Sequence, residues 1–546
     1  MRASLLLLST LLLARGAPAD PRETRPVDAA WREDIRLVAR ELPRMHPNLF
    51  YRMSRASWDS AVSSLEQRLP KLTRNQALVG MMQLVALPND GHTSINPMFD
   101  PNFGWRYYPL QFEWLEDGLF ILAAAPAHGG LVGARVLRIG RVSAEEALVA
   151  VARTLPHENE WWIRAWAPWR LAIPEILEGL GLVQDMEALP LEVEREGRRE
   201  TVVVHPAGRL EPKGHDPNGP IDRSGWVDMQ RAGETPLWRR QPGRPYWVEY
   251  LVESRLLYVC YRGVVSMPDL PNQAFWRGVF ALADSLPVDR LVLDLRENGG
   301  GNSFYNRQMV RSIIARPALD SPDRLFVLIG GRTFSAAMNL VLDLEQWTNA
   351  TFVGTPTGNA TLFFGDHTQL LLPRSGITVN VSSLPWYPSD PRDQRLFKAP
   401  ALYTPFTSRD YVTGHDPALA AILDPSLRPT VADRLVSLLP GADSSALQAE
   451  LLRLRDLPIN RFKSLEAEVN TLGYGRLKEG KTAEAIALFR LNTSVYGRSA
   501  NAWDSLGEAL AATGQQNEAI VAYRQALAID PKLGSSLQAL ERLGQR

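Results

Sequence analysis

Hydrophobic residues recur every three or four positions through residues 27–90, beginning with Trp31 and Ile35. This spacing places them on one face of a helix, so it predicts amphipathic helices. The pattern ends at the sequence Pro-Asn-Asp-Gly (88–91), which is typical of a turn. We therefore expect a helical N-terminal segment over residues 20–103.

Shorter hydrophobic runs, typical of strands, follow in residues 104–205. Residues 206–246 are rich in glycine, proline and charge, which indicates a linker or an irregular insertion. The strands are expected at 119–122, 134–139, 191–194 and 201–204, and the helices near 143–154 and 170–180.

Buried-strand runs alternate with helical stretches through residues 247–430. Such alternation predicts an α/β core. Strands are expected at 291–295, 325–329, 351–354, 370–372 and 377–381, helices near 303–315 and 335–348, and connecting helices over 431–464.

The C-terminal part of the chain contains an internal repeat. Gly473 aligns with Gly507 and Phe489 with Tyr523, each at an offset of 34 residues. This is the period of tetratricopeptide helix hairpins, so residues 465–546 are expected to form an all-α region of these repeats. The repeats either cap the preceding domain or bind a protein partner, and the sequence leaves both roles open.

Charge and cysteine content narrow the function classes. Among 546 residues there are 60 Lys+Arg and 60 Asp+Glu, giving zero formal net charge. This balance gives no reason to expect nucleic acid or an anionic membrane as the main partner. The single cysteine, Cys260, cannot form an internal disulfide, and its hydrophobic setting predicts a buried side chain rather than a nucleophile.

The first residues have the pattern of a secretory signal peptide. Arg2 supplies the positive charge, a leucine-rich run follows, and Ala17-Pro18-Ala19 has the form of a cleavage site. The run has about half of the roughly 20 apolar residues that a membrane span needs. We expect residues 1–19 to be removed, leaving a soluble protein without a membrane span. A chain without disulfides that leaves the cytoplasm fits a periplasmic or secreted bacterial protein.

Two glycine turns, each placed after a buried strand run, carry the candidate chemistry. The first ends in Gly299, Gly300 and Gly301. Glycine permits unusual backbone angles, and exposed amides can stabilise a developing oxyanion. The alternatives are an ordinary turn or a phosphate loop, and the missing lysine excludes the phosphate loop.

The second turn places Ser335 at the expected N-terminus of a helix, after the sequence Gly-Gly-Arg-Thr-Phe (330–334). There the free amides and the helix dipole favour negative charge. Ser335 is therefore either a nucleophile or a plain helix cap.

The segments Leu-Asp-Leu-Arg-Glu-Asn-Gly-Gly-Gly (293–301) and Thr-Phe-Ser-Ala-Ala (333–337) resemble the tail-specific, or C-terminal processing, serine peptidase family. Its tricorn-core and retinol-binding-protein-like branch is the nearest in pattern. The resemblance implies a crotonase- or Clp-protease-like core and a PDZ-like domain at residues 104–205. It also implies that Ser335 attacks a peptide carbonyl. The oxyanion would be held by the amides of Gly300 or Gly301 and of Ala336.

The general base differs from the lysine that many members of this family use. Asn359 stands at that position, and no lysine occurs between Lys213 and Lys398. The Asp-Gly-His-Thr segment (90–93) resembles the histidine segment of the Ser-His-acid members. Because histidine titrates near neutral pH, His92 is the candidate base. Its alternative role is that of a structural turn residue.

The acid that would orient His92 is expected after the strand pair at 370–381. Asp393 is slightly favoured over Asp390, and either could be a surface turn residue. None of the histidines has metal-ligand spacing, so we expect no metal and no cofactor.

The sequence therefore predicts an exported serine peptidase that cleaves a peptide or protein substrate through an acyl-enzyme. Two alternatives remain. One is a degenerate protein that binds peptides without cleaving them, and the other is a hydrolase of small esters or amides.

Overall fold

The computed structural model describes residues 27, 29–97, 100–211, 221, 223–230, 235–388, 390–439 and 443–545. The signal peptide expected at 1–19 lies outside the described residues. The chain forms two compact units. The first contains the described residues up to 350, together with 355–398 and 405–416, and the second contains 351–354, 399–404 and the described residues from 417 onward.

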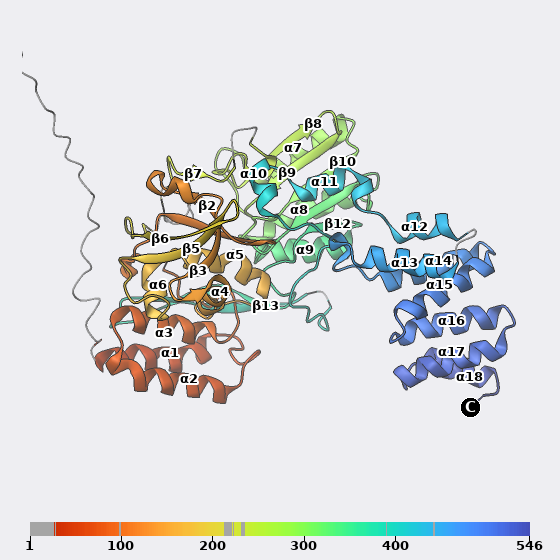
Figure 1. Cartoon of the computed structure of the whole chain (residues 1–546), viewed down its shortest axis with the longest axis horizontal. Coiled ribbons are helices and arrows are strands. Elements are labelled where there is room, and N and C mark those ends of the chain that lie inside the picture. Colours follow the sequence, from red (N-terminus) through yellow and green to blue (C-terminus); the bar gives the residue numbers. More distant parts are fainter. Residues whose placement is uncertain are drawn as a thin grey trace, which may run out of the picture. The chain divides into compact units, whose positions relative to one another are not determined.

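Three helices open the first unit, as the periodic pattern predicted: α1 (Arg32–Met45), α2 (Arg55–Arg68) and α3 (Arg74–Ala86). They lie alongside one another (Figure 1). A capping box begins α3, because the Thr73 side chain accepts from the Gln76 amide and the Gln76 side chain accepts from the Thr73 amide. The turn that carries His92 follows the end of α3 directly.

An antiparallel sheet comes next, in the order β1-β2-β3-β5-β6. Its first strand was not expected from the hydrophobic pattern, whereas the tryptophans of α5 recur at helical spacing. The Asn159 side chain starts α5 by accepting from the amides of Trp161 and Trp162. The helix expected near 170–180 is the shorter α6, which begins at Pro174. The PDZ-like assignment of this region stays a prediction. The elements are β1 (Leu110–Leu115), β2 (Gly118–Ala124), β3 (Arg135–Ile139), β4 (Val142–Ser143), α4 (Ala144–Ala152), α5 (Glu160–Arg170), α6 (Pro174–Gly179), β5 (Leu189–Arg195), β6 (Arg198–Val204) and β7 (Val227–Asp228).

The α/β core of the first unit follows the predicted alternation. Its strands lie in the order β11-β10-β9-β8; β10 is parallel to both β9 and β11, and β8 is antiparallel to β9. Cys260 is buried in β9, as predicted. Because β10 and β11 are parallel neighbours, the turns at their carboxyl ends meet at one edge of the sheet. The elements are β8 (Tyr246–Leu251), β9 (Leu256–Tyr261), α7 (Asn272–Ser285), β10 (Arg290–Asp294), α8 (Asn306–Ile314), β11 (Leu325–Ile329) and α9 (Ala336–Trp347).

A long hairpin, β13 (Phe363–Leu371) with β14 (Thr378–Trp386), connects the core to the N-terminal helices. Val379 and Val381 are fully buried in the same hydrophobic cluster as the helix residues Ile35 and Leu78. Asn380 also forms a β-bridge with Ser94, two residues after His92. The hairpin therefore holds the turn that carries His92. The short helix α10 (Ser408–Thr413) completes this unit.

The second unit is mainly helical. Its two short strands, β12 (Thr351–Gly354) and β15 (Leu402–Tyr403), pair in parallel. In its repeat region Gly473 packs on Phe489 and Gly507 on Tyr523, so the aligned positions make equivalent close helix contacts. The helices, drawn in blue in Figure 1, are α11 (Pro417–Leu423), α12 (Val431–Leu438), α13 (Ser444–Arg455), α14 (Leu465–Lys478), α15 (Thr482–Val495), α16 (Ala500–Ala512), α17 (Gln516–Ile529) and α18 (Gly534–Arg542).

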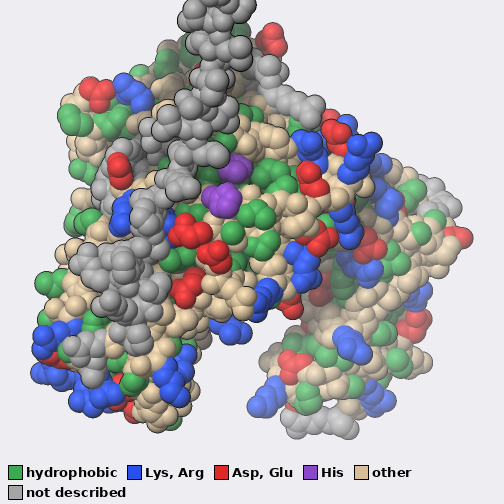
Figure 2. Space-filling view, turned by 60° about the vertical axis from the view of Figure 1, so that its left-hand side comes forward, with side chains coloured by type: hydrophobic (Ala, Val, Ile, Leu, Met, Phe, Trp, Pro, Cys, Tyr) green, Lys and Arg blue, Asp and Glu red, His purple; other side chains and the backbone are tan. Residues whose placement is uncertain are grey.

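The surface is mixed in character. Acidic, basic and hydrophobic side chains are interspersed over much of the face shown in Figure 2, as the zero net charge would suggest. In the part of the chain that the structure describes, no helix is long and apolar enough to cross a membrane.

Candidate active site

The two glycine turns touch each other. Gly300 has φ of +103°, a backbone angle that glycine adopts without strain. A Cβ at this position would lie 2.6 Å from the Ser335 Cβ and 2.9 Å from the Ala336 amide nitrogen. Only glycine therefore allows the loop after β10 to pack against the serine turn.

Ser335 occupies the first position before α9 with φ +56° and ψ −124°. Positive φ is rare for a residue with a side chain, and such strain concentrates at functional sites. The side chain caps no helix amide, so the plain capping role is absent. A half-buried serine at a strained turn before a helix has the geometry of a nucleophile.

The amides around Ser335 are not equivalent. The Gly300 amide donates to Asn298 Oδ1 at 2.9 Å, so it is already engaged. The Ser335 amide donates to Asn359 Oδ1 at 2.5 Å. Among the described residues, the amides of Gly301 and Ala336 have no hydrogen-bond acceptor. Of the three predicted oxyanion donors, these two are available to a ligand.

His92 packs against the serine turn through an aromatic stack. Its ring lies 4.4 Å from that of Phe334, centroid to centroid, and 5.8 Å from that of Phe363. Burial lowers the pKa of His92 below its usual value, although the charge of Asp90 opposes this shift. The ring is therefore neutral near pH 7 and can accept a proton. Its Nδ1 atom is buried without a hydrogen-bond partner, and in the described structure no hydrogen bond joins His92 to Ser335.

Asp90 organises the turn that carries His92. One carboxylate oxygen accepts from His46 Nε2 at 3.0 Å, Thr93 Oγ1 at 2.5 Å and Ser382 Oγ at 2.6 Å. The other accepts from the His92 amide at 3.2 Å. Burial acts to raise the pKa of Asp90, but these donors outweigh it and the pKa lies below its usual range. The charged carboxylate thus holds the turn in one conformation.

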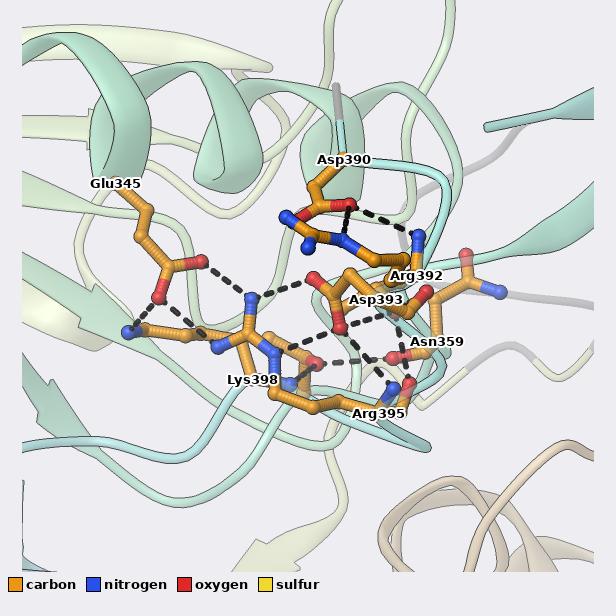
Figure 3. A network of polar contacts seen from close by, with 9 residues as sticks. Glu345, Asn359, Asp390, Arg392, Asp393, Arg395 and Lys398 are labelled. Carbon is orange, nitrogen blue, oxygen red and sulfur yellow. Dashed lines mark hydrogen bonds and ion pairs between the residues drawn. The ribbon is translucent and has the colours of Figure 1, made fainter. Parts of the chain in front are cut away.

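The structure pairs the two predicted acids with arginines, in the network that Figure 3 shows. Asp393 accepts from Thr361 Oγ1 at 3.1 Å and pairs with Arg395 at 2.7 Å. Asp390 pairs with Arg392 at 2.9 Å and is exposed. Among the described contacts, neither carboxylate meets His92. Their arginine partners lie two residues further along the chain, a local pairing that the sequence reasoning did not consider.

Glu158 is a site residue that the sequence reasoning missed. Only 6% of it is exposed. It accepts from the Gly91 amide at 3.0 Å and from Asn359 Nδ2 at 2.5 Å. Burial, and then the neighbouring charge of Asp90, raise the pKa of Glu158 to about 7. Neither spacing nor motif marks Glu158 in the sequence.

Asp90, His92 and Glu158 each offer a ligand atom, and these atoms lie within 4.8 Å of one another. Such a set could hold a cation. However, all four carboxylate oxygens already accept hydrogen bonds from protein donors. The arrangement is therefore better described as a hydrogen-bond network than as a metal site.

Trp162 covers the other side of Phe334. The two rings stack with centroids 4.1 Å apart, and Trp162 also lies 5.4 Å from Trp166. Both tryptophans are half-buried. They form an aromatic wall beside the serine turn.

Known structures share this fold. Mature CPAF complexed with lactacystin has a TM-score of 0.50 at 13% identity, covering 72% of this chain and 97% of that chain. A mutant of CPAF has a TM-score of 0.51 at 12% identity, covering 76% of this chain and 98% of that chain. The photosystem II D1 C-terminal processing protease is more distant, with a TM-score of 0.33, 12% identity, and coverage of 68% and 93%.

The chain therefore shares the fold of CPAF. The resemblance predicted from the glycine and serine turns is confirmed at the level of the fold. A family model of the tetratricopeptide repeat matches residues 500–533, which confirms the repeat predicted at the C-terminus. No curated protein matches the sequence.

Proposed function

We propose that this protein is an exported serine peptidase that cleaves peptide bonds through an acyl-enzyme, with Ser335 as nucleophile and His92 as general base. The strained turn of Ser335, packed against Gly300 beside two unoccupied amides, is the observation that supports this proposal most directly. The fold shared with CPAF makes a protease the natural setting for such a turn.

The chemistry follows from these groups. Ser335 Oγ attacks the substrate carbonyl while its proton passes to the neutral His92 ring. The amides of Gly301 and Ala336 stabilise the resulting oxyanion. Collapse of this tetrahedral intermediate breaks the C–N bond of the peptide, and His92 gives its proton to the leaving amine. Water, deprotonated by His92, then hydrolyses the acyl-enzyme and restores Ser335.

His92 must contact Ser335 during this cycle, although its ring now stacks on Phe334. A rotation of the ring, with substrate bound, would bring a nitrogen atom to the hydroxyl. Catalytic hydrogen bonds commonly tighten only when the substrate is present.

The N-terminal signal pattern supports a location outside the cytoplasm, so we propose that the protein is periplasmic or secreted. The proposed ligand of the repeat region is a protein partner.

A fluorophosphonate probe tests the proposal. The full chain is incubated with the probe and the adduct is located by mass spectrometry. Labelling is expected at Ser335, is lost in Ser335→Ala, and falls at least about 100-fold in His92→Gln. His205→Gln changes an exposed histidine and serves as the control. A correctly folded protein that takes no label would instead favour a peptide-binding protein without catalysis. Lactacystin, which one CPAF structure contains, is a suitable second probe.

A further inference from the structure

Glu158 connects two segments that are far apart in the sequence. One carboxylate oxygen accepts from the Gly91 amide, next to His92, and the other accepts from Asn359 Nδ2. Asn359 Oδ1 in turn accepts the Ser335 amide at 2.5 Å. Through Asn359, the Glu158 side chain thus connects the turn that carries His92 (the base turn) to the turn that carries Ser335 (the nucleophile turn).

We propose that Glu158 is a positioning residue that holds the base turn and the nucleophile turn in place, acting on Ser335 through Asn359. This role depends on Ser335 being the nucleophile, as proposed above. The predicted base His92 and the predicted acids do not make this connection, which requires the asparagine found at position 359 in this chain.

The direction of each hydrogen bond fixes how Asn359 must lie. The Ser335 amide can only donate, so it requires the Asn359 oxygen. The Asn359 NH₂ group then points to Glu158, whose second oxygen accepts from it. The same carboxylate accepts the Gly91 amide with its other oxygen. Each partner therefore has one compatible orientation, and the nucleophile turn cannot shift without breaking the series.

Burying these two polar side chains costs free energy of folding. Glu158 and Asn359 are both buried, and Asn359 has no exposed surface. A buried carboxylate without a directly bonded cation loses much of its hydration. Three titratable groups face Glu158: Asp90 raises its pKa, Arg52 lowers it, and His92 lies within 4.8 Å. A hydrophobic residue would fill the same space at lower cost but would leave the amides of Gly91 and Asn359 unpaired.

Reversing the polarity of the connection tests the proposal. In Glu158→Gln one oxygen remains for two donors, so either the Gly91 amide or the Asn359 NH₂ group faces an NH₂ group and loses its acceptor. Adding Asn359→Asp restores one donor and one acceptor between the two side chains. It also restores an acceptor for the Ser335 amide. The rate of fluorophosphonate labelling at Ser335 is expected to fall about 10- to 100-fold in Glu158→Gln and to recover to within about threefold in the double variant.

Two measurements separate positioning from general stability. Hydrogen exchange of the Ser335 amide is expected to accelerate in Glu158→Gln and to return in the double variant, even where the melting temperature is unchanged. Asn359→Asp alone places two carboxylates together, so its labelling is expected to fall as pH rises. Glu160→Gln, an exposed change on the same segment, is the matched control.

The outcomes are distinguishable. A labelled wild-type protein together with an equally labelled Glu158→Gln variant would overturn the positioning role alone. A folded wild-type protein without label at Ser335 would overturn the proposed function and this role together. Recovery of the labelling rate in the double variant, together with slowed hydrogen exchange of the Ser335 amide, supports the connection from Glu158 through Asn359 to Ser335.

Discussion

The three consecutive glycines allow a graded test of the contact between the two turns. Gly300→Ala places a methyl group 2.6 Å from the Ser335 Cβ and 2.9 Å from the Phe334 carbonyl oxygen, at φ +103°. The backbone strain costs about 1–3 kcal/mol, and the steric conflict costs a further 1–3 kcal/mol or so. The two contributions together lower the free energy of unfolding by about 2–6 kcal/mol.

The structure can relieve this conflict only by moving the serine turn, because the clashing atoms are backbone or Cβ atoms. A displacement of about 1 Å at a reacting group can lower the rate about 100-fold. We therefore expect Gly300→Ala to lose fluorophosphonate labelling by about that factor, with a lower melting temperature measured by circular dichroism.

The neighbouring glycines supply the controls. A Cβ at Gly299 has no atom within 4 Å, so Gly299→Ala is expected to label and melt like the wild type. A Cβ at Gly301 would lie 2.3 Å from the Val264 carbonyl oxygen, so Gly301→Ala is expected to melt earlier through a different contact. Wild-type labelling and melting of Gly300→Ala, or equal damage in Gly299→Ala, would refute the reasoning.

Three further predictions concern stability. The folded chain binds the Glu158 proton up to about pH 7 rather than 4.5, so its contribution to the free energy of unfolding falls as pH rises between these values. This pH-dependent part of the free energy of unfolding is worth about 3 kcal/mol, and denaturant titrations of Glu158→Gln at several pH values should lack it. A pH profile of stability that is the same in Glu158→Gln and the wild type would contradict the raised pKa of Glu158. Gly473→Ala should destabilise the second unit because its Cβ would meet the Phe489 ring at 2.7 Å, whereas Gly475→Ala, within α14 and in open space, should stabilise it by about 0.5–1 kcal/mol. Thermal melts that rank these two variants in the opposite order would contradict the packing. Arg296→Met removes the cation between two buried aspartates and should cost about 3–5 kcal/mol in chemical denaturation, and a neutral effect would show that the buried ion pairs contribute little.

Local patterns account for what the sequence could predict. A run of apolar residues interrupted only by Asp294 predicted β10, and a run of five apolar residues predicted β11; the glycines after them predicted the two turns that meet. The serine and histidine turns were recognisable because their residues are contiguous. The tryptophans of α5 recur at helical spacing, and the cap from Asn159 shows where that helix begins.

Long-range hydrogen bonds account for what the sequence could not predict. Glu158 and Asn359 are 201 positions apart, and no periodicity relates them. Asp393 was favoured because of its distance from the nucleophile along the chain, but the structure engages it with Thr361 and Arg395. A carboxylate's partner depends on which segments fold together, and position along the chain does not determine that.

The hairpin β13–β14 has a consequence for how the chain folds. The Asp90 carboxylate that shapes the base turn accepts from Ser382, 292 positions later, and Asp34 in α1 accepts from the Ser375 amide at a separation of 341. Contacts between such distant positions form slowly, because a long loop must close before they contribute any stability. A nascent or truncated chain that ends before this hairpin would contain both Ser335 and His92. It would nevertheless lack the support that shapes the turn around His92, so this turn would take its final form only after the hairpin has folded.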